Sequence, residues 1–283
     1  LDTVKCLSKL GKLRLVQGDH AVVRSYFERA LAIQEEVLGL KHPDTAESLN
    51  NLGELMFVRG DYVAARSYYE RSLTIYTEVL GAEHPDTAKS LSNLGELLFI
   101  HGDYTSARRY FEQAQAIYGE VLTAKHPEMA GSLNKLGKLL LIQGDYGTAR
   151  IYFERALAIQ EEVLGSKHPD TAESLNNLGE LLLVLNDYAA SRYCFERALA
   201  IREAVFQINH PKIAESLNNL GYLLQLEGKY ASARPYYERA LAMQVEVLGT
   251  AHPELSFSLM HLGTLMLGRN EYVNARTYFE KAL

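Results

Sequence analysis

Several features that mark common protein classes are missing from this chain of 283 residues. No apolar run approaches the roughly 18 residues that suggest a membrane-spanning helix, so we expect no contact with a membrane. Only two cysteines are present, Cys6 and Cys194, which excludes a disulfide framework and favours a reducing, cytoplasmic location. The formal net charge is −6, which disfavours a nucleic-acid-binding protein, because such proteins carry a basic excess.

The motifs of the common enzyme and cofactor classes are missing as well. There is no Walker loop, no HExxH metal motif, no G-x-S-x-G elbow and no Rossmann glycine pattern. Six histidines stand in His-Pro pairs 42 residues apart, so we expect them to be spread along the molecule rather than gathered around one ion. The sequence therefore predicts a non-enzymatic protein without cofactor or metal.

What the chain has instead is a repeat. The stretch Lys41–Leu55, KHPDTAESLNNLGEL, returns unchanged at Lys167–Leu181. A fixed period of this size is typical of a solenoid, in which each unit contacts only its neighbours. We expect one solenoid domain over residues 1–283, made of seven units at about 1–41, 42–83, 84–125, 126–167, 168–209, 210–251 and 252–283.

The two ends of the chain fall at uneven points of the repeat. Leu1 aligns with Pro43, where a helix is expected to begin, and no signal peptide precedes it. Leu283 aligns with Leu73, inside the second unit. We therefore expect a piece excised from a longer protein, with its last unit truncated.

One unit reads as two helices. Pro43 suits the first turn of a helix, and apolar residues then follow with helical spacing from Leu49 to Met56. Gly60-Asp61 breaks this pattern and predicts a turn, and Gly81 closes the second helix. A glycine also recurs inside every first helix, as Gly53 in this unit, although glycine costs about 1 kcal/mol there relative to alanine. We attribute it to close approach of the aromatic residue that recurs in the second helix, here Tyr69.

The unit resembles the tetratricopeptide repeat (TPR). Leu52-Gly53, Ala65, Tyr69 and the small residue at Ser72 match that pattern, although the tetratricopeptide unit has about 34 residues and this one has 42. The longer unit, with HPD-TA, LNNLG, GDY, RALAI and EEVLG, is similar to the kinesin light chain class. Glycine stands where that class has alanine after LNNL, and Arg66 stands where it often has an acidic residue, so a motor-cargo function is not implied.

The resemblance implies an all-α fold. It predicts an α-solenoid of seven antiparallel helix–turn–helix units in a right-handed superhelix, with the first helices lining a concave groove that binds a protein or peptide. Asparagine amides can pair with an extended peptide backbone because they both donate and accept. The predicted groove residues are Asn50, Asn51, Asn93, Asn134, Asn176, Asn177, Asn218 and Asn219, with the charged residues Lys9, Lys12, Lys135, Lys138, Glu54, Glu96 and Glu180.

Alternatives remain open at this stage. One asparagine of each pair can instead bond the neighbouring repeat, with Asn51, Asn177 and Asn219 as the stronger candidates, because most side-chain hydrogen bonds go to backbone. The charges can form a solvated face. Identical stretches 126 residues apart suggest a duplicated block of three units, with either two similar sites or copied scaffold. The chain can also be a spacer that associates head to tail through uncapped ends.

Overall fold

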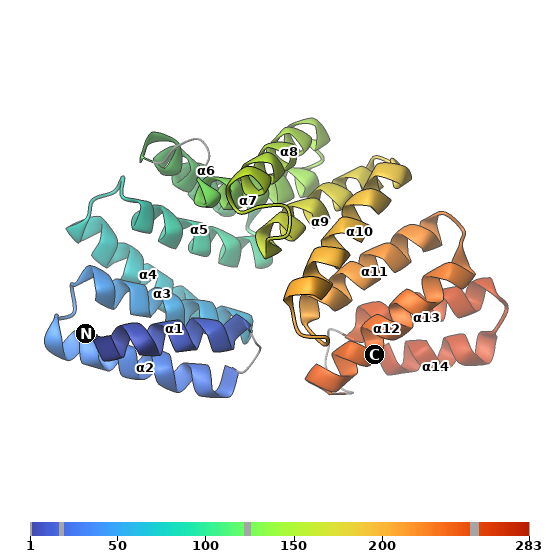
Figure 1. Ribbon diagram of the computed structural model, residues 1–283, viewed down its shortest axis with the longest axis horizontal. Helices are drawn as coiled ribbons and strands as arrows, with labels where there is room; N and C mark the ends of the chain where they lie inside the picture. The colour runs from blue at the N-terminus through green and yellow to red at the C-terminus, as the bar shows by residue number, and fades with distance from the viewer. Residues whose placement is uncertain (1, 17–19, 122–125, 250–254, 283) are drawn as a thin grey trace. The chain divides into compact units, whose positions relative to one another are not determined.

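The computed structural model describes residues 2–16, 20–121, 126–249 and 255–282, and throughout these residues the regular structure is α-helical (Figure 1). The helices are α1 (Asp2–Val16), α2 (His20–Val37), α3 (Pro43–Val58), α4 (Tyr62–Val79), α5 (Pro85–Ile100), α6 (Tyr104–Val121), α7 (Pro127–Gln143), α8 (Tyr146–Val163), α9 (Pro169–Val184), α10 (Tyr188–Val205), α11 (Pro211–Leu226), α12 (Tyr230–Leu248), α13 (Leu255–Gly268) and α14 (Tyr272–Ala282). Each predicted repeat is one helix pair, so the all-α repeat fold is confirmed.

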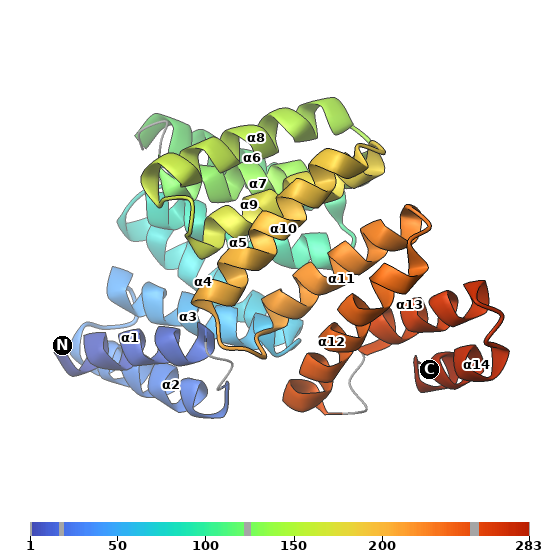
Figure 2. The same cartoon turned by 45° about the vertical axis from the view of Figure 1, so that its right-hand side comes forward.

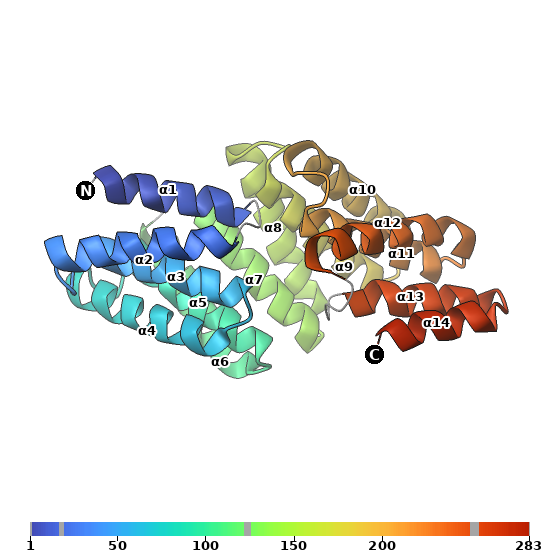
Figure 3. The same cartoon turned by 90° about the horizontal axis from the view of Figure 1, so that it is seen from below.

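The chain divides into two compact units, Leu1–Tyr152 and Phe153–Leu283, and the division falls within the sequence of α8. In the first unit α1, α3, α5 and α7 contact one another in sequence, and each second helix packs against its own first helix and the next one (Figure 3). The same scheme holds in the second unit, where α9, α11 and α13 lie side by side (Figure 2). The single domain expected over the whole chain stays a prediction.

Five of the described first helices begin with a histidine cap followed by proline. His42 Nδ1 accepts a hydrogen bond from the backbone N–H of Asp44 at 3.1 Å, and Pro43 occupies the first turn, where no N–H is needed. The same bond starts α5, α7, α9 and α11 at His84, His126, His168 and His210. At these five places the His-Pro motif is a helix start, as its structural interpretation predicted. The sixth pair, at residues 252 and 253, lies outside the described residues.

Glycine and asparagine form the turns within the helix pairs. Gly60, Gly102 and Gly144 have φ of +76°, +79° and +80°, which confirms the turn predicted for the Gly-Asp motif. Asn186 and Asn270 take the same left-handed conformation, with φ of 60° and 62°. The Gly-Asp motif at residues 18 and 19 lies outside the described residues.

The first-helix glycines lie against aromatic rings, as the repeat pattern predicted. A Cβ added to Gly53 would come within 2.5 Å of the Tyr69 ring, and one added to Gly179 within 2.6 Å of the Phe195 ring. Both rings are buried. The glycine lets the two helices of a pair approach closely, and the aromatic ring fills the space that a side chain would take.

The ion pair expected on every second helix forms in most of the described copies. Arginine Nε lies 2.6 to 2.7 Å from glutamate Oε1 in the pairs Arg24–Glu28, Arg66–Glu70, Arg108–Glu112, Arg234–Glu238 and Arg276–Glu280. Arg192 instead bonds Glu227, in the next pair. At this copy the prediction of an i,i+4 bond is wrong, because the half-buried Glu227 competes for the guanidinium.

Candidate functional site

The first helices carry a repeated line of mostly polar side chains, which we call the first-helix stripe. In α3 it consists of Asp44, Glu47, Asn51 and Glu54, spaced by 3, 4 and 3 residues. This spacing keeps the side chains on one face of a helix. The copies in the other first helices begin at Asp2, Asp86, Glu128, Asp170 and Lys212, and α13 contributes Phe257, His261 and Thr264.

The first asparagine of each pair is buried in the joint between consecutive repeats. Asn50 Nδ2 donates to Ser90 Oγ at 2.9 Å, and Asn218 Oδ1 accepts from Ser258 Oγ at 3.0 Å. Asn134 and Asn176 are buried as well. Contact between these first asparagines and a peptide stays a prediction. Their buried position in the joint favours a role in holding neighbouring repeats together.

The second asparagine belongs to the stripe itself. Asn51 is 3% exposed and Asn177 is 1% exposed, and among the described residues the Nδ2 of each finds no hydrogen-bond partner. Asn219 Nδ2 donates to Asn176 Oδ1 at 2.9 Å, while Asn93 is half-buried. A buried donor without a partner costs about 1–3 kcal/mol. The Nδ2 atoms of Asn51 and Asn177 are also shielded from solvent, so an oxygen atom of a ligand can accept from them only if the side chains around them move.

Two of the predicted basic groove residues are paired with acidic residues of the neighbouring repeat. Lys12 Nζ lies 2.8 Å from Glu47 Oε1, and Lys135 Nζ lies 2.8 Å from Glu96 Oε2. Glu180 accepts from Asn176 Nδ2 at 2.7 Å. Glu54 and Lys9 are exposed, and Lys138 is half-buried. The stripe is thus crossed by ion pairs rather than lined by unpaired cations at Lys12 and Lys135.

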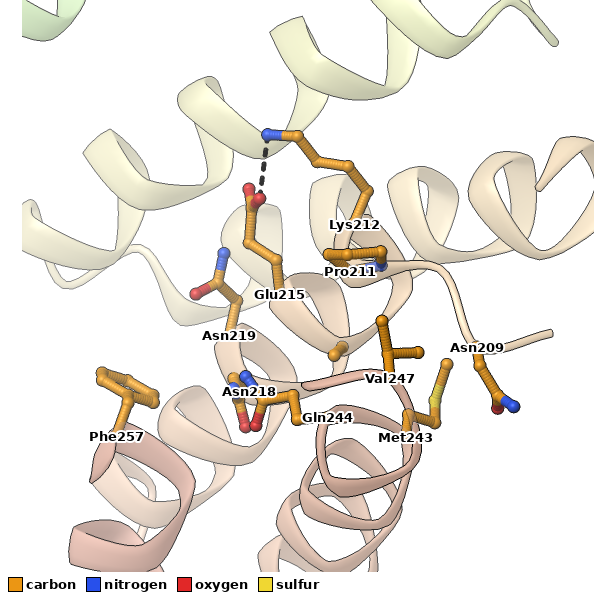
Figure 4. Close-up of a pocket in the computed structure, with 11 residues that line it drawn as sticks. Asn209, Pro211, Lys212, Glu215, Asn218, Asn219, Met243, Gln244, Val247 and Phe257 are labelled. Atoms are coloured by element: carbon orange, nitrogen blue, oxygen red, sulfur yellow. Dashed lines mark hydrogen bonds and ion pairs between the residues drawn. The ribbon is translucent and has the colours of Figure 1, made fainter. Parts of the chain in front are cut away.

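A pocket of about 410 Å³ lies between the start of α11, the end of α12 and the start of α13 (Figure 4). Its apolar side is formed by Met243, Val247 and Phe257, and Asn218 and Asn219 supply amide groups. The oxygen of Asn218 is occupied by Ser258, and the amide nitrogen of Asn219 by Asn176. The pocket therefore offers mainly apolar contacts.

The charged residues beside this pocket neutralise one another. Lys212 Nζ lies 2.9 Å from Glu215 Oε2, as the dashed line in Figure 4 shows. The nearly fully buried Arg202 lies 3.4 Å from Glu215, and it also donates to Ser216 Oγ at 2.6 Å. Because Glu215 balances two cations, its carboxylate is engaged within the protein.

The corresponding place between α3, α4 and α5 is a smaller and more polar pocket of about 110 Å³. Tyr76 stands there in place of Gln244, and Lys89 in place of Phe257. Burial and then the carboxylates of Asp86, Glu47 and Asp44 raise the pKa of Tyr76, so its phenol remains neutral. The position between consecutive helix pairs is therefore lined mainly by polar residues in the first unit and has more apolar surface in the second.

A family comparison identifies the repeat. The model of the tetratricopeptide repeat matches four stretches of the chain, residues 3–57, 50–120, 128–204 and 212–283. The chain belongs to the tetratricopeptide repeat family. Tetratricopeptide repeats generally mediate contacts between proteins and are generally not catalytic. A search of curated proteins found no significant match.

Solved tetratricopeptide structures share the fold at low sequence identity. The nearly identical TPR-like repeats of a Podosopora anserina protein assigned to the kinesin light chains are 24% identical, with a TM-score of 0.56, over 72% of this chain and 97% of that one. BtubC (BKLC) from P. vanneervenii is 23% identical, with a TM-score of 0.61, over 84% and 92%. Apo RapI is 14% identical, with a TM-score of 0.56, over 84% and 96%. The resemblance to kinesin light chain-like repeats is confirmed at the level of fold.

Aromatic residues near the end of this tetratricopeptide array were missed by the sequence interpretation. His261 stacks on Tyr237 with ring centroids 5.2 Å apart, and it also contacts Phe257 at 4.3 Å and Tyr222 at 5.2 Å. Burial lowers the pKa of His261. The signal was present in the repeat alignment, since Phe257 and His261 stand where α3 has Glu47 and Asn51.

No helix in the described parts of the chain combines the length and apolarity needed to cross a bilayer. Within the same residues, no three histidine, cysteine or carboxylate side chains are placed to hold a metal ion together.

Proposed function

We propose that this tetratricopeptide array is a protein-binding scaffold whose first-helix stripe holds an extended segment of a partner protein. The observation that carries the proposal is the pair of buried Nδ2 groups on Asn51 and Asn177, which lack an acceptor within the described residues. They stand at the same position of α3 and α9. A peptide carbonyl at each position would complete the missing hydrogen bond, provided that the side chains shielding the Nδ2 atom move aside when the peptide binds.

The predicted duplication of a three-unit block supports two similar contacts. Asn51 and Asn177 both follow a buried asparagine, and both precede a carboxylate on the stripe, Glu54 and Glu180. Each compact unit therefore carries one unpaired amide donor in the same local setting. This repetition suits a ligand backbone, since every residue of a peptide offers a carbonyl oxygen.

The pocket at α11–α13 supports a preference for an apolar side chain in the second unit. Its volume of about 410 Å³ lies in the range of ligand pockets. Met243 and Phe257 offer apolar contact, and Lys212 and Glu215 neutralise each other. A Leu-like or Phe-like side chain of the partner would gain burial there without leaving a charge unpaired.

The test uses peptides selected from a library of short random sequences against the whole chain. Each selected peptide is then titrated by fluorescence anisotropy into wild type, Asn51→Ala and Asn177→Ala. Because one neutral hydrogen bond contributes about 0.5–1.5 kcal/mol net, the variant at the contacted site should bind about two- to tenfold more weakly. If the selected peptides keep full affinity for both variants, the first-helix stripe does not hold them through these asparagines and the proposal is wrong.

Asn50→Ala is the matched structural control. It removes the bond to Ser90 in the joint between α3 and α5, so it should lower the urea midpoint of unfolding. Asn51→Ala removes an unpaired amide and should leave that midpoint unchanged or raise it. This contrast separates loss of binding from loss of folding.

Self-association is a second candidate function, and the exposed face of α1 favours it. Leu10 is 47% exposed and Leu13 is 56% exposed, whereas their copies Leu52 and Leu55 are buried against the preceding pair. A second molecule of this chain would cover the same face. Sedimentation velocity over a range of concentrations tests this: Leu10→Lys with Leu13→Lys should abolish association, and a monomer at every concentration would exclude it.

A further inference from the structure

A second hollow lies on the other side of the repeat, between the second helices α4 and α6. It has a volume of about 440 Å³, and its walls come from α4, α5, α6 and the turn before α5. Leu91 forms part of its floor and lies two residues from Asn93, about 200° around the helix axis. The hollow therefore faces away from the first-helix stripe, and its function does not depend on the one proposed there.

An ion pair spans the corresponding gap between second helices at three other places in the repeat. Arg71 Nη2 lies 3.3 Å from Glu35 Oε1, between α2 and α4. In the second unit the same positions hold Arg197 with Glu161 at 2.8 Å, and Arg239 with Glu203 at 2.7 Å. Between α4 and α6 the two positions are Gln113 and Thr77, and both line the hollow. Loss of the long arginine and its partner leaves the space open.

The hollow combines an apolar interior with an acidic rim. Leu73, Leu91 and Ile117 provide aliphatic surface, while Glu83 and Glu120 are exposed at the edge. No lysine or arginine is among its described lining residues. An aliphatic group can be buried on this floor, and positive charges beside it would meet the two carboxylates.

We propose that the hollow between α4 and α6 binds a partner segment in which one aliphatic residue is flanked by basic residues. The aliphatic side chain enters between Leu73 and Ile117, and the flanking cations lie against Glu83 and Glu120. The occupant is a segment of another protein. Its basic residues are favoured by the acidic rim, and its aliphatic residue is favoured by the apolar interior.

The probe is the blocked peptide acetyl-Gly-Arg-Leu-Arg-Gly-amide, titrated into methyl-labelled protein. The Cδ1 methyl signal of Ile117 should shift and saturate. The peptide with Glu in place of both arginines, and the peptide with Ser in place of leucine, should each shift it at least tenfold less at equal concentration. Equal shifts with all three peptides, or no saturable shift with the first, would overturn the proposal.

The decisive variant is Thr77→Glu with Gln113→Arg, which installs the ion pair found at three other gaps. These residue types already occupy these positions in three other pairs, so the fold should tolerate them. The double variant should abolish the Ile117 shift. Glu35→Thr with Arg71→Gln removes an equivalent pair at the neighbouring gap, and it should leave the shift unchanged. A shift that survives the first double variant would contradict the proposal.

Charge reversal gives an independent check. Glu83→Lys with Glu120→Lys should invert the preference, so that the glutamate-flanked peptide shifts Ile117 more than the arginine-flanked one. An unchanged preference would show that the rim does not select the ligand. If the Ile117 signal moves with protein concentration alone, a second copy of the chain occupies the hollow, and the proposal is wrong.

Discussion

At the scale of single residues, the glycine inside each first helix matters through the ring that it faces. Gly95 and Gly179 have Phe111 and Phe195 as neighbours, at distances that an added methyl group could not keep. Gly131 also lies within a helix, but nothing stands within 4 Å of its missing Cβ. Glycine is therefore required at Gly95 and Gly179, where a side chain would clash with a ring, and it only weakens the helix at Gly131, where a side chain would fit.

This contrast gives a stability prediction. Gly179→Ala should lower the free energy of unfolding, because overpacking against Phe195 costs about 1–3 kcal/mol and outweighs the better helix propensity. Gly131→Ala should raise it by about 0.5–1 kcal/mol, since only the propensity changes. Urea titration of both variants measures the shifts, and an equal effect at the two positions would disprove the packing explanation.

His261 predicts a dependence on pH. Burial lowers its pKa below the ordinary histidine value of about 6.5, so the unfolded chain binds the proton more tightly than the folded one. Stability should therefore fall as the pH drops from about 6.5 toward the folded pKa, and it should be unaffected by this group above that range.

The matched variant for this effect is His261→Asn, the residue found at the equivalent Asn219 and Asn177. Wild type should lose more stability than the variant between about pH 7.5 and pH 5.5, and the difference isolates His261 from the other histidines. Equal losses in urea midpoint would show that the half-buried ring of His261 does not resist protonation.

At the scale of the helix, α3, α5, α7, α9 and α11 each begin with an imidazole nitrogen that accepts a backbone hydrogen bond. His168 Nδ1 accepts from the N–H of Asp170 at 3.2 Å, next to Pro169. His168→Ala should lower the free energy of unfolding by about 1 kcal/mol, as for other lost caps, whereas His168→Asn should largely keep it. Circular dichroism during thermal unfolding would measure both variants, and equal melting temperatures for Ala and Asn would argue against capping.

The sequence predicted where the helices begin and end better than it predicted which side chains of each helix face the next repeat. The 42-residue step, the His-Pro starts and the Gly-Asp turns follow from local chemistry, so the helix pairs were predictable. Asn50 and Asn51 lie between Leu49 and Leu52, and apolar spacing alone does not decide which of them faces the next repeat. The pairing of Lys12 with Glu47, 35 residues away, depends on how one repeat stacks on the next.

At the scale of the whole molecule, the chain forms two compact units, and among the described residues of each unit the helix pairs contact the pairs next to them in sequence. Stability in such arrays is approximately a sum of repeat and interface contributions. A destabilising substitution should therefore lower the stability of its own helix pair and of the adjacent pairs, rather than that of the entire chain.

Hydrogen exchange can test this locality with Gly179→Ala. Amide protection should fall in α9, α10 and α11, which pack around the affected joint, and it should stay at the wild-type level in α3 and α5 of the first unit. Uniform loss of protection over both units would instead indicate one cooperative domain.

The most direct test of the central claim observes the unpaired amides themselves. The side-chain N–H signals of Asn51 and Asn177 are recorded by ¹⁵N NMR with and without a selected peptide. If the stripe holds a peptide backbone, the Nδ2 signals of the contacted residue should shift on binding, while those of Asn50, already bonded to Ser90, should move little. Binding that leaves the signals of both Asn51 and Asn177 unmoved would contradict the account.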